Sequence, residues 1–147
     1  MQSTNNASIL SSASVAPFIG RLLMAAIFLI SGAGKLMAPA GTIGYIASVG
    51  IPLPELAYAG ALAMELGGAL LLVAGYRTRW VAAALALFSV VSAVIFHSAL
   101  GDQNQLFHFL KNLALAGGLL QVVAFGAGSF SLDESRAELP VALGAAR

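Results

Sequence analysis

Four long apolar stretches dominate the chain, and shorter segments rich in proline, glycine or charged residues separate them. The stretches cover residues 17–37, 54–75, 80–97 and 106–125. Each is close to the roughly 20 residues that an α-helix needs to cross the roughly 30 Å hydrocarbon core of a bilayer. The pattern therefore predicts an all-α integral membrane domain over residues 17–127, in which four transmembrane helices form an antiparallel bundle.

The segment between the first two stretches, residues 42–49, is too short to cross a bilayer. Ile43, Ile46 and Val49 fall on one side of a helix, and Tyr45 suits a membrane interface. We therefore expect a short interfacial helix between the first and second transmembrane helices.

The two ends of the chain differ from the apolar stretches. Residues 1–16 are polar and rich in Ser and Asn, which predicts a disordered tail and does not fit a secretory signal. Residues 128–147 carry mixed charge. Ser131 and Glu134 are spaced to cap one short helical turn, but we expect the rest of this tail to be too polar and too short to pack.

Composition supports the membrane assignment and excludes several functions. The chain is 59% hydrophobic and only 9% charged, whereas soluble domains carry about 25% charged residues. The net charge of +1 and the absence of a basic run argue against a nucleic-acid partner. Because the sequence contains no cysteine, it has no disulfide, thiolate metal site or iron–sulfur cluster.

One acidic side chain, Glu65, falls near the middle of the second apolar stretch. A charged group at the centre of a bilayer costs about 2.5 kcal/mol or more, so Glu65 should face the interior of the bundle. Three residues on its helical face are small enough to let another helix approach closely, and the whole face carries Tyr58, Ala61, Gly68, Ala69 and Leu72. We therefore predict Glu65 as a proton acceptor or as the floor of a pocket.

The expected topology gathers further polar groups at one end of the bundle, which we take as the outer end. Lys111 is the first candidate for an ion partner of Glu65, because it lies about a turn and a half into the fourth helix, and Lys35 is the second. We expect a pocket that opens to the outer face above Glu65. The alternative is an ion pair that only holds helices together. The candidate ligand-binding residues are Lys35, Lys111, His108, Asn112, His97 and Tyr58.

His97 and His108 invite a haem or metal interpretation, since imidazole binds both. They lie at the rim of the bundle and are separated by one loop, whereas a haem usually needs two histidines facing each other across a bundle. We therefore expect them to hydrogen-bond loop groups, and we predict no metal site.

Basic residues set the expected orientation. Arg21, Arg77 and Arg79 fall on the side of the bundle that carries both chain ends. By the positive-inside rule this side faces the cytoplasm.

Four segments of the sequence together resemble the DoxX family of small four-helix membrane proteins. They read RLLMAAIFLISGAGKLMAP, TIGYIASVGIPLPE, AMELGGALLLVAGYRTR and LKNLALAGGLLQVVAFGAGSFSLDE. The resemblance extends over residues 17–134 and implies a location in the bacterial inner membrane. Arg21, Lys35 and Glu65 match the charged positions of the family. The last segment often reads Gly-Pro-Gly followed by a basic residue in this family, whereas Ala127 and Ser129 stand there in this chain.

Three functions follow as hypotheses. The resemblance implies a membrane subunit or partner of a quinone-linked redox or oxidative-stress system, with quinone as the substrate and with electrons supplied by a partner protein. Whether such a subunit is itself an enzyme is left open. The second hypothesis is a small membrane carrier or binding protein for a lipid-soluble or organic ligand. The third is a structural assembly partner, for instance within a homo-oligomer.

Overall fold

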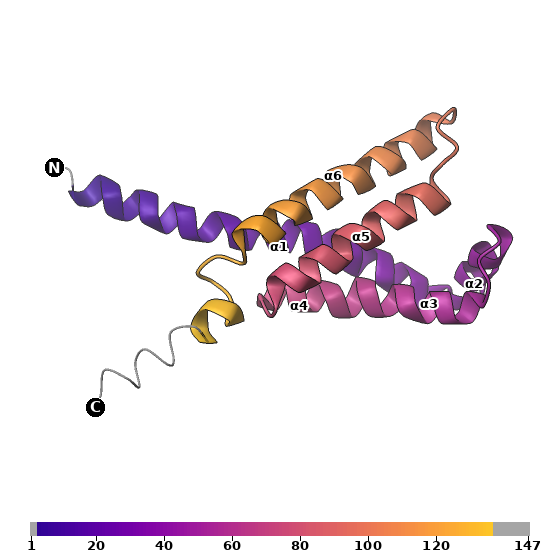
Figure 1. Ribbon diagram of the computed structural model, residues 1–147, viewed down its shortest axis with the longest axis horizontal. Helices are drawn as coiled ribbons and strands as arrows, with labels where there is room; N and C mark the ends of the chain where they lie inside the picture. The colour runs from indigo at the N-terminus through magenta and orange to yellow at the C-terminus, as the bar shows by residue number, and fades with distance from the viewer. Residues whose placement is uncertain (1–2, 137–147) are drawn as a thin grey trace.

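The computed structural model describes residues 3–136 of the chain and their side chains from residue 15 onward. The described residues form helices and connecting turns, and the predicted all-α fold is confirmed (Figure 1). In chain order the elements are α1 (Ser3–Met37), α2 (Pro39–Ser48), α3 (Pro54–Leu62), the π-helical turn η1 (Ala63–Gly68), α4 (Ala69–Ala74), α5 (Thr78–Phe96) and α6 (Gln103–Phe125).

Four helical segments have the length and hydropathy to cross a membrane, as the sequence predicts. They are Val15–Met37, Pro54–Ala74, Thr78–Phe96 and Gln103–Phe125. The second is continuous through α3, η1 and α4, so these three elements form one rod. Large apolar side chains such as Leu23, Ile30 and Leu87 remain more than half exposed on the outside of these segments. Such a surface is stable against lipid and not against water.

The interior of the bundle is made largely of small residues. Alanines alternate with a few larger side chains, so the helix backbones approach closely, as they do in other membrane bundles. In Figure 1, α1 runs along the rod formed by α3, η1 and α4, and α5 and α6 form a hairpin whose α5 packs on η1. The buried cluster consists of Ala25, Phe28, Ala69, Leu72, Ala82, Leu85, Ala86, Ala116, Leu119 and Val122.

Helix α1 begins earlier than the sequence predicts. It extends from Ser3 through Pro17, so residues 3–16 are helical where we expected disorder. Adding residues to a helix that is already anchored in a bundle costs little compared with starting a new one, which accounts for the difference. The expected short helix between the first two spans is present as α2, with Pro39 in its first turn.

The segment that follows α6 also departs from expectation, because part of it packs. Residues 132–136 form a short helix, and the Glu134 N–H donates to the Ser131 Oγ at 3.2 Å, which confirms the predicted capped turn. The Asp133 N–H donates to the Gly75 carbonyl oxygen at 2.9 Å and ties this segment to the turn between α4 and α5. Residues 137–147 lie outside the described part of the chain.

Gly75 makes this docking possible. Its φ of +68° is the left-handed conformation that ends a helix, and glycine adopts it without strain. A Cβ atom at this position would lie only 2.4 Å from the Cβ of Ser131 and 2.7 Å from a guanidinium nitrogen of Arg21. The end of α4, the segment after α6 and α1 therefore meet at a point where no side chain fits.

Arg21 is the second connection at this end of the bundle. It is 1% exposed although it belongs to a membrane-spanning segment. Its Nη1 donates to the carbonyl oxygens of Leu72 at 2.8 Å and Val73 at 3.0 Å, and its Nη2 donates to the carbonyl oxygen of Phe130. The last carbonyls of a helix have no partner within that helix, so Arg21 caps α4 and fastens the segment after α6 to it.

Candidate intramembrane charge site

Glu65 lies in the π-helical turn η1 and is 4% exposed. A π-turn inserts an extra residue into a helix, shifts the faces before and after it, and is frequent at functional sites. Gly32 of α1 lies directly opposite. A Cβ at Gly32 would be 2.7 Å from Leu66 Cδ2 and 3.2 Å from Glu65 Cβ, so the glycine lets α1 come this close without displacing Leu66. The carboxylate is therefore held in a helix–helix contact with no room for a bulky neighbour.

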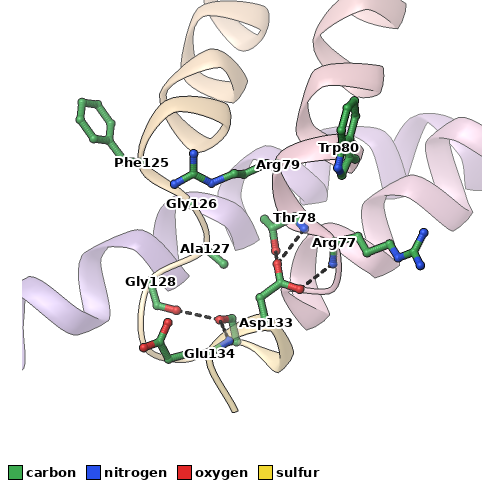
Figure 2. Close-up of a pocket in the computed structure, with 11 residues that line it drawn as sticks. Arg77, Thr78, Arg79, Trp80, Phe125, Gly126, Ala127, Gly128, Asp133 and Glu134 are labelled. Carbon is green, nitrogen blue, oxygen red and sulfur yellow. Dashed lines mark hydrogen bonds between the residues drawn. The ribbon is translucent and has the colours of Figure 1, made fainter. Parts of the chain in front are cut away.

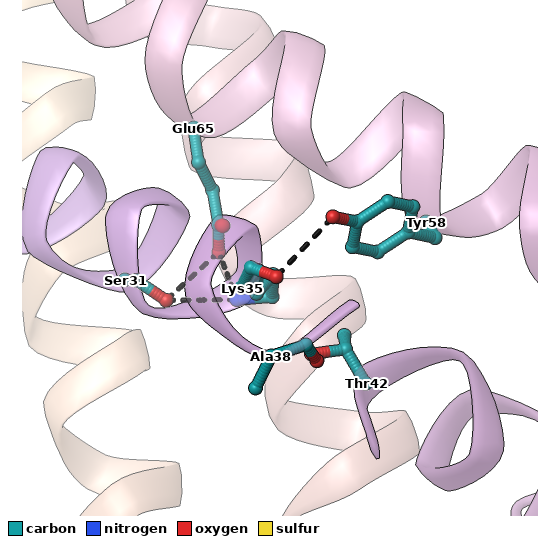
Figure 3. Close-up of polar contacts among 6 residues, drawn as sticks. All are labelled: Ser31, Lys35, Ala38, Thr42, Tyr58 and Glu65. Carbon is teal, nitrogen blue, oxygen red and sulfur yellow. Dashed lines mark hydrogen bonds and ion pairs between the residues drawn. The ribbon is translucent and has the colours of Figure 1, made fainter. Parts of the chain in front are cut away.

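An ion pair to α1 compensates the buried carboxylate (Figure 3). Lys35 Nζ lies 2.7 Å from Glu65 Oε1, with the lysine side chain 26% exposed and the glutamate 6%. Ser31, one helical turn before Lys35, completes a triangle: its Oγ accepts from Lys35 Nζ at 2.8 Å and donates to Glu65 Oε1 at 3.0 Å. Three polar groups thus satisfy one another inside a membrane-spanning region.

The second carboxylate oxygen of Glu65 is not satisfied in the same way. Glu65 Oε2 is buried and has no hydrogen-bond partner among the described residues. A buried acceptor without a donor is costly, and in native structures it often marks a place where a proton, a water or a ligand binds. The site therefore has one oxygen fixed by Lys35 and Ser31, and one that is buried without a donor.

Tyr58 of α3 joins the same site from the other side of Lys35. Its hydroxyl donates to the backbone carbonyl oxygen of Lys35 at 3.2 Å, near the end of α1 (Figure 3). Thr42 of α2 donates in a similar way to the carbonyl oxygen of Ala38 at 2.9 Å. The Thr42 bond belongs to the first turn of α2, whereas the Tyr58 bond satisfies a carbonyl oxygen at the end of α1 and holds the backbone at Lys35. Among the residues that the sequence singles out, Lys35, Tyr58 and Glu65 are brought together.

Lys111, our first candidate partner for Glu65, is not part of this site. It belongs to α6, its side chain is exposed, and it forms no ion pair with a described carboxylate. The reason is the order of the helices: α6 packs mainly on α5, and α1 lies against η1. The prediction was wrong because it assumed that the fourth helix faces the second. Ser31, which the sequence places on the same stripe of α1 as Lys35, was not proposed as a site residue.

The two histidines form a separate cluster on the α5–α6 hairpin. Their rings stack with centroids 5.0 Å apart, and His97 Nδ1 lies 2.8 Å from Gln105 Oε1. Asn112 Nδ2 donates to the carbonyl oxygen of His108 at 3.0 Å, within the same helix. No group of three potential metal ligands occurs in the described part of the chain. Their contacts are those of residues that hold the hairpin end together.

The pocket that we expected above Glu65 stays a prediction, and Gly32 of α1 lies close to Leu66 and Glu65 there. Hollows are found at the opposite end of the bundle. One has a volume of about 400 Å³ and lies where α5 begins and α6 ends (Figure 2). The other has a volume of about 600 Å³ and lies between the end of α4 and the segment around Phe130.

Comparison with known proteins places the chain among small membrane proteins. The family model described as DoxX matches residues 16–98. The inner membrane protein YqjF of Escherichia coli K12 is 34% identical over 122 residues, which cover 81% of this chain and 90% of that protein. The inner membrane protein YphA of the same organism is 38% identical over 120 residues, which cover 78% and 86%. No solved structure gives a significant match.

Proposed function

Because the chain belongs to the DoxX family and its relatives are inner membrane proteins, we propose that it is an inner-membrane component of a quinone-linked redox system, with Glu65 as the proton-accepting group. The observation that carries the proposal is the Lys35–Glu65 pair inside two membrane-spanning segments, with one buried carboxylate oxygen left without a partner. Ionisable residues at this depth are costly and are usually kept for function.

Because a carboxylate accepts protons, the geometry suits the oxidation of a quinol, which is the reverse of the quinone reduction that electrons from a partner protein would drive. A quinol that passes two electrons to a partner protein releases two protons, and a carboxylate within hydrogen-bond reach accepts the first of them. Lys35 and Ser31 hold Oε1 of Glu65, so the proton goes to Oε2. The second proton and both electrons leave through the partner protein.

Access to the pair is from the side of Lys35. This side chain is 26% exposed, compared with 6% for Glu65. The exposed apolar residues close to it in the sequence, Ile30, Leu36 and Met37, lie on other sides of α1 and suit contact with lipid or with an isoprenoid chain. A quinol approaching from the bilayer therefore meets an apolar surface first and the charged pair second.

Quinone content of the purified protein tests the proposal. We expect protein extracted in a mild detergent to carry quinone at close to one molecule per chain, measured by solvent extraction and mass spectrometry. The double variant Lys35→Met with Glu65→Gln removes both charges without leaving either one buried alone, and it should lose this quinone while remaining folded. Equal trace amounts of quinone in both proteins contradict the proposal. A different lipid-soluble molecule bound only to the unmodified protein favours the carrier hypothesis.

A further inference from the structure

The hollow at the opposite end of the bundle combines charged and aromatic groups in a way that the charge site does not explain. It lies between the turn that begins α5, the end of α6 and the segment after it (Figure 2). The spans of α5 and α6 both have an end here, so the hollow lies at the level where hydrocarbon gives way to headgroups. Its lining consists of Arg77, Thr78, Arg79, Trp80, Phe125, Gly126, Ala127, Gly128, Ser131, Asp133 and Glu134.

Two arginines and two carboxylates line the hollow, but only one of each sign presents its charge to it. Asp133 is fully engaged: one carboxylate oxygen accepts from the Arg77 N–H at 2.7 Å, and the other accepts from the N–H and the hydroxyl of Thr78 at 2.8 and 2.7 Å. The Arg77 guanidinium lies against the ring of Tyr76 and points away from the loop after α6 (Figure 2). The charges left facing the hollow are those of Arg79 and Glu134.

Arg79 and Glu134 have no ion partner among the described residues. Figure 2 shows the guanidinium of Arg79 reaching over Gly126 and the carboxylate of Glu134 beside Gly128. A Cβ at Gly126 would lie 3.6 Å from two guanidinium nitrogens, so Arg79 lies over this glycine and leaves only enough space for a small side chain. One cation and one anion thus lie at different edges of the same hollow and do not neutralise each other.

Aromatic side chains mark the depth of the site. Trp80 and Phe125 are each 79% exposed and line the hollow from the two helices. Tryptophan is enriched at the boundary between headgroups and acyl chains. A molecule bound here would have its charged part between Arg79 and Glu134 and its apolar part against these rings.

We propose that this hollow binds the headgroup of a zwitterionic phospholipid with a primary amine, namely phosphatidylethanolamine. The phosphate pairs with Arg79, and the ammonium donates hydrogen bonds to Glu134. The choice follows from charge balance, because the two charges that face the hollow, Arg79 and Glu134, sum to zero and Glu134 opposes a lipid with net negative charge. Choline offers no N–H donor to this carboxylate, so ethanolamine binds better.

Trp80 provides the measurement, since it is the only tryptophan in the sequence and lines the site. The full chain is reconstituted into phosphatidylcholine vesicles that contain phosphatidylethanolamine brominated near the start of its acyl chains. Quenching of Trp80 fluorescence gives an association constant relative to phosphatidylcholine. We expect a preference of about fivefold for phosphatidylethanolamine, the size of effect that one additional hydrogen bond from the ammonium to Glu134 gives, and a smaller preference for phosphatidylglycerol.

Variants that remove the same charge at different positions distinguish a specific headgroup site from general electrostatic attraction to the membrane surface. Arg79→Gln removes the group that holds the phosphate beside Glu134, so the contact between the ammonium and Glu134 is no longer fixed and the preference over phosphatidylcholine should fall toward one. Arg77→Gln removes the same charge from the same turn and should leave the preference unchanged. Glu134→Gln should weaken the binding of phosphatidylethanolamine and strengthen the binding of phosphatidylglycerol. Circular dichroism and thermal unfolding in detergent confirm that each variant is folded. Equal quenching by all brominated lipids overturns the proposal, and so does an equal effect of Arg77→Gln and Arg79→Gln.

Discussion

The Nζ atom of Lys35 lies 2.7 Å from Oε1 of Glu65, although the two residues belong to different membrane-spanning segments. Each charge alone would be costly in hydrocarbon, and the pair removes most of that cost. Ser31 contributes two hydrogen bonds to the same centre. The contact therefore fastens α1 to η1 and at the same time keeps a carboxylate inside the bundle.

Removing one partner of this pair should be more harmful than removing both. We expect Lys35→Met to lower the free energy of unfolding by about 3 kcal/mol, because it leaves the buried carboxylate of Glu65 without a cation. The double variant with Glu65→Gln should recover most of this loss. Reversible unfolding in mixed micelles measures the free energy of unfolding of the single and the double variant. Lys111→Met is the control and should change little, because Lys111 is exposed on α6. A larger loss for Lys111→Met than for Lys35→Met would contradict the observed pairing.

The membrane-spanning segments were predictable from the sequence, but the pairs of helices that pack against each other were not. Bilayer thickness fixes the length of a spanning helix, so hydropathy identifies all four within a few residues. Which helix faces which depends on close packing of small residues, and many positions in this chain are small. Gly32 allows α1 to approach Glu65, and this contact selects Lys35 over Lys111. The π-turn that carries Glu65 has no signature in hydropathy.

The segment after α6 shows a second limit of sequence reasoning. The polarity of this stretch predicts a solvated tail, because its sequence contains no apolar helical face. Its docking depends on hydrogen bonds to backbone groups at helix ends, made by Arg21 and Asp133. Such bonds depend on which helix ends lie close together in space, and a linear pattern of residues does not reveal that.

Arg21→Lys should destabilise this end of the bundle even though the charge is kept. The guanidinium donates to three carbonyl oxygens on two separate segments, whereas an ammonium is a compact charge that does not reproduce this fork. We expect a loss of about 2 kcal/mol in the free energy of unfolding. Faster proteolysis after Gly128 should accompany it. Arg79→Lys serves as the control, and equal stability of the Arg21 variant and the unmodified protein would refute the capping role.

Docking of Asp133 should depend on pH. Burial alone raises the pKa of this carboxyl, but hydrogen bonds from Thr78 and the Arg77 N–H, together with the charge of Arg136, outweigh burial and lower the pKa below its usual value of 3.8. A lowered pKa in the folded state adds stability above pH 3.8, and this stability is lost as the pH falls through the folded value.

Proteolytic release of residues 130–136, measured with an acid-active protease, should therefore increase as the pH falls below about 4. Asp133→Asn provides the matched control, because it keeps the shape of the side chain and cannot titrate. In that variant release should be faster and should not change with pH in this range. The same pH dependence in both proteins would show that another group is responsible.

The orientation of the chain is predicted by its arginines and can be tested directly. The sequence contains no cysteine, so single cysteines at Ser135 and Asn104, both exposed, report on one side each. We expect an impermeant thiol reagent to label position 104 in intact spheroplasts and to label position 135 only after lysis. The reverse pattern would place both chain ends outside and would move the hollow beside Arg79 to the outer leaflet.

The central claim is that the carboxylate of Glu65 acts as a proton acceptor, and Glu65→Gln tests it most directly. Glutamine keeps the shape and hydrogen bonds to Ser31 but cannot take up a proton at the pH of the cell. The measurement is quinol-dependent electron transfer in membranes of a deletion strain that carries either version of the protein, at matched expression and thermal stability. We predict that the Gln variant gives no more activity than the deletion strain. Full activity of the Gln variant would contradict the account and would leave Glu65 as a structural contact between α1 and η1.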